Sequence, residues 1–263
     1  MAVSIATDIF AAENPTARVD GDFYKIDEAG LPACDIYDGG APCQTYSVAG
    51  KKAGKEERGL LMFEQLEYLR HHQPALGVFE QVPNFQLMHG GAFMREFVEA
   101  LEALDYVVSH KILEARHFDS CQHRERLFVV AARGDVHRAR GDFEFPRPVS
   151  AERPAKTILA PLPTFEGERF PLRDFRPCEP VHYESGLIKV GSVHPHQRRG
   201  CTVWSPEGLL PAQRCVGQGP AGATGLVLRE GVPTRVTIEE SMVAQQLPER
   251  MLQDHSITQS MVG

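Results

Sequence analysis

Apolar and polar residues follow two different periods in the first half of the chain. Apolar runs bounded by turn residues predict β-strands, and the segments between them carry apolar residues at helical spacing. This alternation of strand and helix predicts an α/β fold, doubly wound around a buried parallel sheet. The predicted strands are Cys34–Tyr37, Leu76–Glu80, Tyr106–Leu113 and Leu127–Ala132, and the predicted helices carry Leu60, Leu61, Phe63, Leu66 and Leu69, and Phe93, Phe97, Leu101 and Leu104.

The second half has a different pattern. Eight prolines between positions 146 and 180 argue against regular structure there. Short apolar runs among glycines and prolines then predict a small β-rich lobe, with strands at Leu187–Val190, Cys201–Trp204 and Leu226–Leu228. Thr237, followed by Glu239 and Glu240, predicts the start of a helix. We therefore expect an α/β domain over 1–140, a Pro-rich connector over 141–180, the lobe over 181–225, and a return segment over 226–263 packed on the α/β domain.

Composition narrows the class of protein. Hydrophobic residues make up 42% and charged residues 24% of the 263 positions, the profile of a globular protein rather than a fibrous or disordered one. The net charge of −7 argues against binding nucleic acid by bulk charge, although a local basic groove remains compatible with it. The sequence shows no signal peptide and no apolar stretch of about 18 residues, so we expect a cytoplasmic protein without a membrane segment. Its six cysteines lack CxxC spacing, so free thiols and no metal site are expected.

One cysteine has an unusual setting. Two glycines and Ala41 follow the first predicted strand, and Pro42-Cys43-Gln44 comes next. Ligands of open α/β sheets bind beyond the carboxyl ends of the strands, which favours a site at Cys43 over a packed structural thiol. Basic residues after it would lower the pKa of its thiol: Lys51, Lys52, Lys55 and Arg58.

Two further groups of residues could carry chemistry. Glu80 closes the predicted strand Leu76–Glu80, either as a carboxylate facing water or as a partly desolvated acid that donates a proton. Arg124 and Arg126 are two apart on an extended segment and so share one face. They form either a surface charge cluster or a grip for a phosphate or a base carbonyl.

Together these blocks resemble one family. GGAPCQTYSVAG, FEQV and QHRER, in this order and spacing, are similar to motifs of the DNA (cytosine-5) methyltransferases. Gly21-Asp22-Phe23 and Arg58–Leu61 stand where that family has two further motifs, Gly200–Pro211 resembles its target-recognition segment, and Arg235–Pro248 its penultimate motif. The resemblance implies an S-adenosylmethionine-dependent methyltransferase-like sheet with a β-rich target-recognition lobe.

The resemblance also implies roles. Cys43 would add as a thiolate to C6 of a cytosine flipped out of double-stranded DNA, Glu80 would protonate N3, and Arg126 would bind the carbonyl. Arg124 and Gln122 would organise the pocket. The loop Tyr46–Arg58 would close over the base. S-adenosylmethionine would lie against Asp22, Leu61 and Pro42, and DNA would contact Gln44, Ser47, Lys51, Lys52, Gln122, Arg198 and Arg199.

The sequence departs from the family pattern in several places. Gln81 replaces an asparagine, Ala212-Gln213 replaces Thr-Leu, and Val243 replaces an arginine. The family's glycine-rich cofactor loop, Asp-x-Phe-x-Gly-x-Gly-Gly, and its Gly-Asn-(Ala/Ser)-Val tail have no counterpart here. A GxGxxG at Gly217–Gly222 contains a proline and is not expected to bind a cofactor.

Several hypotheses therefore stay open. The chain is an active DNA cytosine-5 methyltransferase, or a fragment that needs a second polypeptide to supply the cofactor-loop strand and terminal helix, or an inactive DNA-binding protein. An unrelated cysteine-dependent enzyme is a further alternative. Its catalytic histidine would come from His71, His72, His89, His110 and His117.

Overall fold

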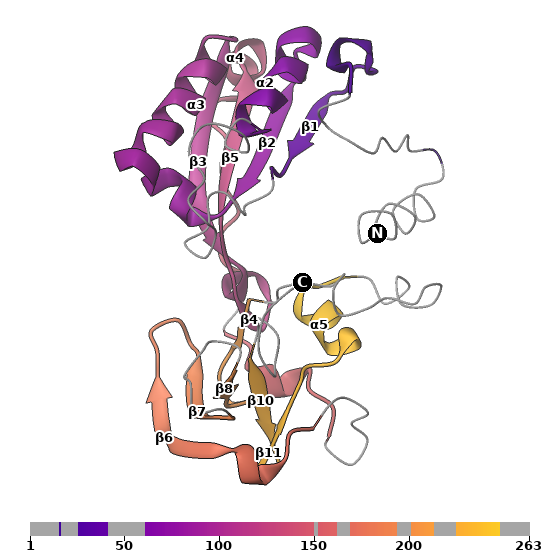
Figure 1. Cartoon of the computed structure of the whole chain (residues 1–263). Helices are drawn as coiled ribbons and strands as arrows, with labels where there is room; N and C mark the ends of the chain where they lie inside the picture. The colour runs from indigo at the N-terminus through magenta and orange to yellow at the C-terminus, as the bar shows by residue number, and fades with distance from the viewer. Residues whose placement is uncertain are drawn as a thin grey trace. The chain divides into compact units, whose positions relative to one another are not determined.

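The computed structural model describes Thr16 and residues 26–41, 61–149, 152–161, 169–193, 201–212 and 225–247 (Figure 1). These residues form two compact units. The α/β unit holds the described residues between Asp20 and Leu113 and between Glu125 and Arg147. The β-rich unit holds Thr16, Glu114–Arg124 and the described residues from Pro148 onward.

The α/β unit is built on a four-stranded sheet with the order β1-β2-β5-β3. Strands β1 and β2 are parallel, with Ile36 opposite Leu76 and Gly39 opposite Phe79. Strand β5 runs antiparallel to β2. The strands are β1 (Ile36–Gly39), β2 (Leu76–Gln81), β3 (Tyr106–Glu114) and β5 (Glu125–Arg133).

The expectation of a wholly parallel sheet is therefore wrong for β5. Only a short helical turn, η5 (Ala115–Phe118), and the two-residue strand β4 (Gln122–His123) separate β3 from β5. A parallel return needs a crossover of a dozen residues or more, usually a helix. The apolar run of β5 suggested a parallel strand because both its faces are buried, with Val129 and Val130 at 0% and 3% exposure.

Two helices cover one face of this sheet, α2 (Leu61–His72) and α3 (Ala92–Glu102), close to where the apolar spacing predicts them (Figure 1). Alternate residues of β2 point into their core, so Phe79 is fully buried and packs edge-on against Phe97 at a ring distance of 5.2 Å. Between β2 and α3 lies η4 (Pro83–Gly91), where His89, Gly90 and Gly91 have positive φ and redirect the chain into α3. A short helix that the sequence did not predict, α4 (Gly134–Arg140), follows β5 directly.

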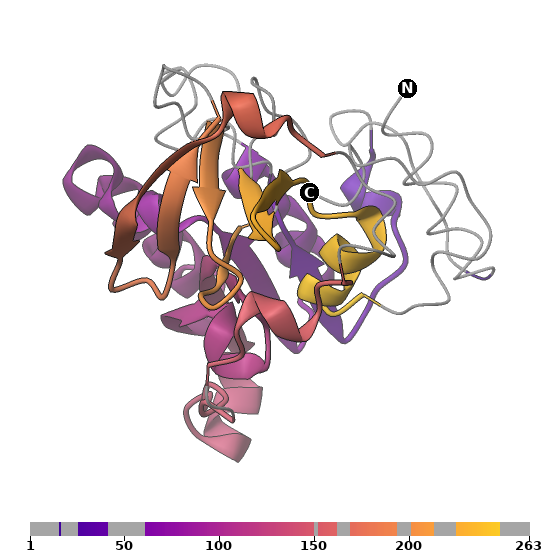
Figure 2. The same ribbon diagram turned by 90° about the horizontal axis from the view of Figure 1, so that it is seen from below.

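The β-rich unit contains a five-stranded sheet with the order β11-β10-β8-β7-β6, drawn in orange and yellow in Figure 2. Neighbouring strands are antiparallel except β8 and β10, which are parallel. A separate parallel pair joins β4 to β9 (Leu210–Pro211). The five strands are β6 (Arg176–His182), β7 (Ile188–Ser192), β8 (Thr202–Trp204), β10 (Leu226–Arg229) and β11 (Val232–Thr234).

Two elements of this unit differ in how well the sequence predicts them. Strand β6 was not expected because it contains Pro177 and Pro180, but it lies at the sheet edge, where proline is tolerated, and all its residues are exposed. Helix α5 (Ile238–Ala244) begins after Thr237 as predicted. Short helical turns complete the described chain: η2 (Glu28–Gly30), η6 (Ala155–Thr157) and η8 (Leu172–Asp174).

Among these described elements, no helix has the length and apolar character that crossing a membrane requires.

Candidate active site

The carboxyl ends of β1 and β2 lie at the same edge of the α/β sheet, because the two strands are parallel. Gly40, directly after β1, is close to Glu80 at the end of β2: a Cβ atom on Gly40 would lie 3.7 Å from Glu80 Oε2. The described chain continues to Ala41, and Pro42 and Cys43 follow outside the described residues. The segment that leads to Cys43 therefore starts beside the Glu80 carboxylate.

Gln81 ties these two strand ends together. Its side chain is 1% exposed, and its Nε2 donates a hydrogen bond of 2.7 Å to the carbonyl oxygen of Ala41. Its Oε1 accepts from the backbone N–H of Val82 at 3.3 Å. The longer reach of glutamine, where the family pattern has asparagine, is thus used to bond the backbone of the segment before Pro42.

Gly39 is required by close packing at the same edge. A Cβ atom here would overlap the Gln65 amide and lie 2.9 Å from the Tyr37 ring. Any larger residue would force the Gln65 or Tyr37 side chain, or the strand end itself, to shift, which explains the glycine that ends β1.

Arg126 and Glu80 form an ion pair. Arg126 Nε lies 2.6 Å from Glu80 Oε1, with 21% and 41% of the two side chains exposed. The antiparallel direction of β5 brings them together, because it places the start of β5 beside the end of β2, with Phe128 opposite Glu80. Arg126 Nη1 donates to the carbonyl of Glu125 at 2.8 Å. Strand β5, which was expected to be parallel to β2, thus supplies the partner of Glu80 because it is antiparallel.

Gln122 and Arg124 belong to the β-rich unit. Gln122 is 2% exposed, and its Nε2 donates to the carbonyl of Ala244 in α5 at 2.8 Å. The Arg124 side chain is partly exposed, and its backbone N–H donates to Glu114 Oε1 at 2.9 Å. Gln122 was predicted both as an organiser of the pocket and as a DNA contact, and both roles stay predictions.

Glu114 was not among the site residues expected from the sequence, although its position at the end of a predicted strand could have indicated it. Glu114 is the last residue of β3, and Glu80 is the last but one of β2, so each is a carboxylate at a strand end. Burial raises the cost of its charge, but the His123 ring, the Arg124 backbone N–H and the Arg116 guanidinium outweigh it and hold the pKa of Glu114 below its ordinary value. Glu114 is therefore an ionised, buried carboxylate next to the QHRER segment.

The cysteines of the described residues divide into two groups. Cys34 and Cys178 are exposed, whereas Cys121 and Cys201 are buried. Burial raises the pKa of the Cys121 thiol to about 11, so this thiol is a packing residue rather than a nucleophile. Within the described ranges, no three His, Cys, Asp or Glu side chains gather in a way that could hold a metal ion.

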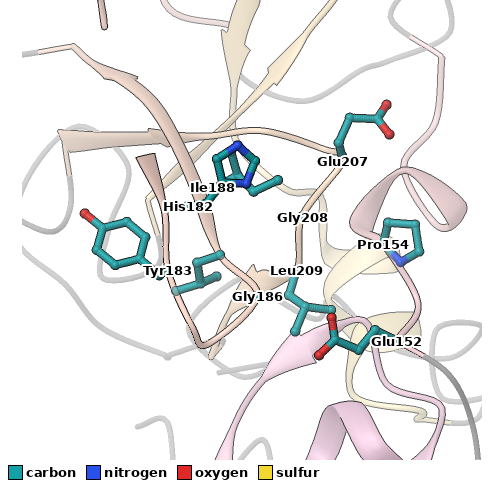
Figure 3. A pocket seen from close by; sticks show the side chains of 10 residues that line it. Glu152, Pro154, His182, Tyr183, Gly186, Ile188, Glu207, Gly208 and Leu209 are labelled. Carbon is teal, nitrogen blue, oxygen red and sulfur yellow. The ribbon is translucent and has the colours of Figure 1, made fainter. Parts of the chain in front are cut away.

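The β-rich unit also has a cavity of about 310 Å³, shown in Figure 3. Two of its carboxylates are already paired: Glu207 with Lys156 at 2.6 Å and Glu152 with Arg116 at 2.9 Å. Tyr183 and His182 line it beside the backbone of Gly186 and Gly208. No residue of this cavity was a candidate from the sequence.

The remaining predicted site residues stay predictions. Leu61 is the first residue of α2, but the structure does not describe its side chain. The other candidates fall outside the described residues: Asp22, Pro42, Cys43, Gln44, Ser47, Lys51, Lys52, Arg198 and Arg199.

Comparison with known proteins gives one consistent family. The C-5 cytosine-specific DNA methylase family matches residues 4–166, more than half of the chain. The chain is 32% identical over 224 residues to the Type II methyltransferase M.HhaI of Haemophilus parahaemolyticus, covering 81% of this chain and 65% of that protein. It is 36% identical over 140 residues to the Type II methyltransferase M1.ScrFI of Lactococcus lactis subsp. cremoris, covering 53% of this chain and 36% of that protein. The chain thus spans less than two thirds of the length of either relative.

Solved structures agree at the level of the fold. The S. pombe Dnmt2 methyltransferase matches with a TM-score of 0.63 and 14% identity, over 98% of this chain and 82% of that chain. The Entamoeba histolytica methyltransferase EhMeth matches with a TM-score of 0.60 and 14% identity, over 98% of this chain and 80% of that chain. The mixed α/β architecture is therefore that of the methyltransferase fold.

Proposed function

Because this chain belongs to the C-5 cytosine-specific DNA methylase family, we propose that it catalyses methyl transfer from S-adenosylmethionine to C5 of a cytosine in double-stranded DNA. The observation that supports this most directly is the Arg126–Glu80 ion pair, which lies at the sheet edge where β1 leads to Pro42 and Cys43. Open α/β sheets bind their ligands at this edge.

The chemistry needs a nucleophile, because C5 of cytosine reacts poorly with a methyl sulfonium. The Cys43 thiolate forms a bond to C6, the ring electrons move toward N3, and N3 takes a proton from the Glu80 carboxyl group. C5 of the resulting enamine would then accept the methyl group that S-adenosylmethionine supplies when bound, with S-adenosylhomocysteine as the leaving group. Loss of the C5 proton to a base, return of the N3 proton to the Glu80 carboxylate and departure of the Cys43 thiolate then restore the aromatic ring.

Arg126 is suited to orient the base. A guanidinium carries five N–H donors in a planar fork. Among the described residues, its Nε is bonded to Glu80 and its Nη1 to the carbonyl of Glu125, and Nη2 has no partner. The same side chain can therefore bond the Glu80 carboxylate and offer Nη2 to the O2 carbonyl of cytosine.

The target base is inaccessible inside a duplex, so it must be flipped out before Cys43 can reach C6. We assign the reading of the DNA target to the lobe over 181–225, and the binding of S-adenosylmethionine to Asp22, Leu61 and Pro42. Gln44, Ser47, Lys51 and Lys52 would contact the DNA beside the flipped base.

The test is covalent trapping. A duplex library with random sequence and 5-fluorocytosine in place of cytosine is incubated with the protein and S-adenosylmethionine, and adducts that survive denaturing electrophoresis are counted. The fluorine cannot leave as a proton does, so the enzyme stays bonded to C6. We expect wild type and Cys178→Ser, which changes an exposed thiol, to form adducts equally, and Cys43→Ser to form none.

An adduct with Cys43→Ser would refute Cys43 as the nucleophile. A wild-type chain that binds the library without forming an adduct would favour the alternative, a DNA-binding role or a requirement for a second polypeptide that completes the cofactor site.

A further inference from the structure

The segment before β5 carries Arg124, which the family resemblance assigns to organising the catalytic pocket, and backbone bonds in the β-rich unit anchor this segment. Its strand β4 pairs with β9, where Gln122 lies opposite Leu210, and the N–H of Leu210 donates to the carbonyl of Cys121 at 2.8 Å. Gln122 adds its side-chain bond to Ala244. Up to Gln122, the position of this segment is therefore set by β9 and α5.

Beyond Gln122, the segment is held by the carboxylate of Glu114. Glu114 is 7% exposed, and its two oxygens have separate partners. Oε1 accepts from the backbone N–H of Arg124 at 2.9 Å, and Oε2 bonds His123 Nδ1 at 2.8 Å, with Arg116 Nε 3.8 Å away. The backbone N–H of Ala115 also donates to the carbonyl of Arg124 at 3.0 Å. Both polar groups of the Arg124 peptide are thus bonded to Glu114 or its neighbour.

The arrangement has a clear place in the chain. Glu114 is the last residue of β3, and Arg124 is the last residue before β5 begins. The carboxylate therefore joins the end of one long strand to the start of the next. Charge-assisted hydrogen bonds of this kind are about twice as strong as neutral ones. Removing one partner at a buried site is costly, because the other group is left without a hydrogen bond and without water.

We propose that Glu114 is a positioning residue for the methyl-transfer reaction: its buried carboxylate fixes the backbone at Arg124, and so the place from which the Arg124 side chain acts. The inference rests on the proposed function, because it assigns Glu114 to the same reaction. Glu114 does not touch the reacting atoms and acts through Arg124.

The test compares three variants with wild type. Glu114→Ala removes both bonds. Glu114→Gln can keep both at pH 8, because its carbonyl oxygen accepts from Arg124 N–H and its amide N–H₂ donates to an unprotonated His123 Nδ1. Glu152→Gln is the matched control, because it removes the other ion-pair partner of Arg116 without touching Arg124.

Two measurements are made on each protein. The rate of adduct formation with the 5-fluorocytosine library is measured at saturating and limiting DNA, and amide hydrogen exchange is measured over residues 122–126. For Glu114→Ala we expect a roughly 10- to 100-fold slower adduct rate at saturating DNA, less than about threefold change in the DNA concentration for half-maximal rate, and faster exchange over 122–126. Glu152→Gln should match wild type in both.

The pH profile separates positioning from packing. As the pH falls from 8 toward 5.5, a histidine gains its second proton, and a protonated His123 Nδ1 would face the amide N–H₂ of Glu114→Gln as donor against donor. Among the described residues, the titratable or charged groups that face this position are His123 and Arg116, with Glu152 bonded to Arg116. The rate of Glu114→Gln should therefore fall relative to wild type at low pH and equal it, within about threefold, at pH 8.

Each outcome decides the inference. Unchanged exchange in Glu114→Ala, or faster exchange with an unchanged adduct rate, would overturn it while leaving the proposed function intact. A wild-type protein that forms no adduct would overturn methyl transfer by this chain alone, and the role of Glu114 in that reaction with it. Slow adduct formation in Glu114→Ala together with rescue by Glu114→Gln at pH 8 would support it.

Discussion

At the scale of single residues, burial decides which thiols can react. Cys121 lies directly before Gln122 in the proposed catalytic segment, yet only 2% of it is exposed, and burial raises its pKa to about 11. At pH 8 such a thiol is about one part in a thousand thiolate, against about a quarter for an ordinary thiol. Proximity in sequence to a catalytic motif therefore does not make this cysteine a nucleophile.

This difference can be measured by alkylation. With iodoacetamide at pH 8, we expect the exposed Cys34 and Cys178 to be modified and the buried Cys121 and Cys201 to stay unmodified, as read by peptide mass spectrometry. The same reagent in concentrated urea should label all of them. Labelling of Cys121 at the rate of Cys178 in the folded protein would contradict its packing role.

At the scale of elements, α5 depends on one carboxylate. Glu240 Oε1 accepts from Arg229 Nη1 at 2.7 Å and from the N–H of Ala160 at 2.8 Å. Its Oε2 accepts from Arg229 Nη2 at 2.6 Å and from the N–H of Thr237 at 2.9 Å, while Thr237 Oγ1 accepts from the N–H of Glu240. Glu240 thus takes part in both the capping box of a two-turn helix and a buried bidentate ion pair. Each of its two oxygens accepts two hydrogen bonds.

Substitutions here should differ in cost. Glu240→Ala removes the bidentate carboxylate partner of the buried Arg229 guanidinium, so we expect a loss of about 3–5 kcal/mol in the free energy of unfolding. Thr237→Ala removes one cap bond and should cost about 1 kcal/mol. Urea unfolding followed by circular dichroism measures both, and equal costs for the two variants would show that the ion pair adds nothing to the cap.

The same elements show what the sequence could predict. The Thr-x-x-Glu spacing is local, so it predicts the start of α5 at Thr237, and apolar spacing likewise predicts α2 and α3. The pairing of Glu240 with Arg229 joins two elements, as does the bond of Glu114 to Arg124, and no local pattern encodes either. The direction of β5 was missed because burial on both faces removes the alternation that distinguishes antiparallel strands. In the site, residue types at strand ends indicated Glu80, but its partnership with Arg126 depends on that direction.

At the scale of the whole molecule, charge is the main obstacle to the proposed partner. The net charge of −7 repels DNA, so binding requires local basic clusters. The sequence offers two, Lys51 with Lys52 and Arg198 with Arg199, and both lie outside the described residues. Exposed arginines also occur on α4, at Arg138 and Arg140, and they provide a comparison of equal charge.

We expect the double variant Arg198→Ala/Arg199→Ala to weaken DNA binding and to reduce the slope of log K against log salt by up to about two, because each phosphate contact contributes about 0.9. Arg138→Ala/Arg140→Ala changes the net charge equally and should leave the slope unchanged. Fluorescence anisotropy with a labelled duplex across a salt series measures both. Equal slopes for the two double variants would show that Arg198 and Arg199 do not contact phosphates.

The division of the chain has a consequence for building chimeras with relatives of different target sequence. The β-rich unit is not one insertion, because the short stretch Glu114–Arg124 belongs to it and interrupts the α/β unit between β3 and β5. That stretch bonds the later part of the chain through Leu210 and Ala244. A graft that exchanges only the residues after Pro148 would therefore separate Glu114–Arg124 from the residues that it bonds. If this unit reads the DNA target as proposed, a chimera has to exchange both stretches together or keep the residues at their contacts.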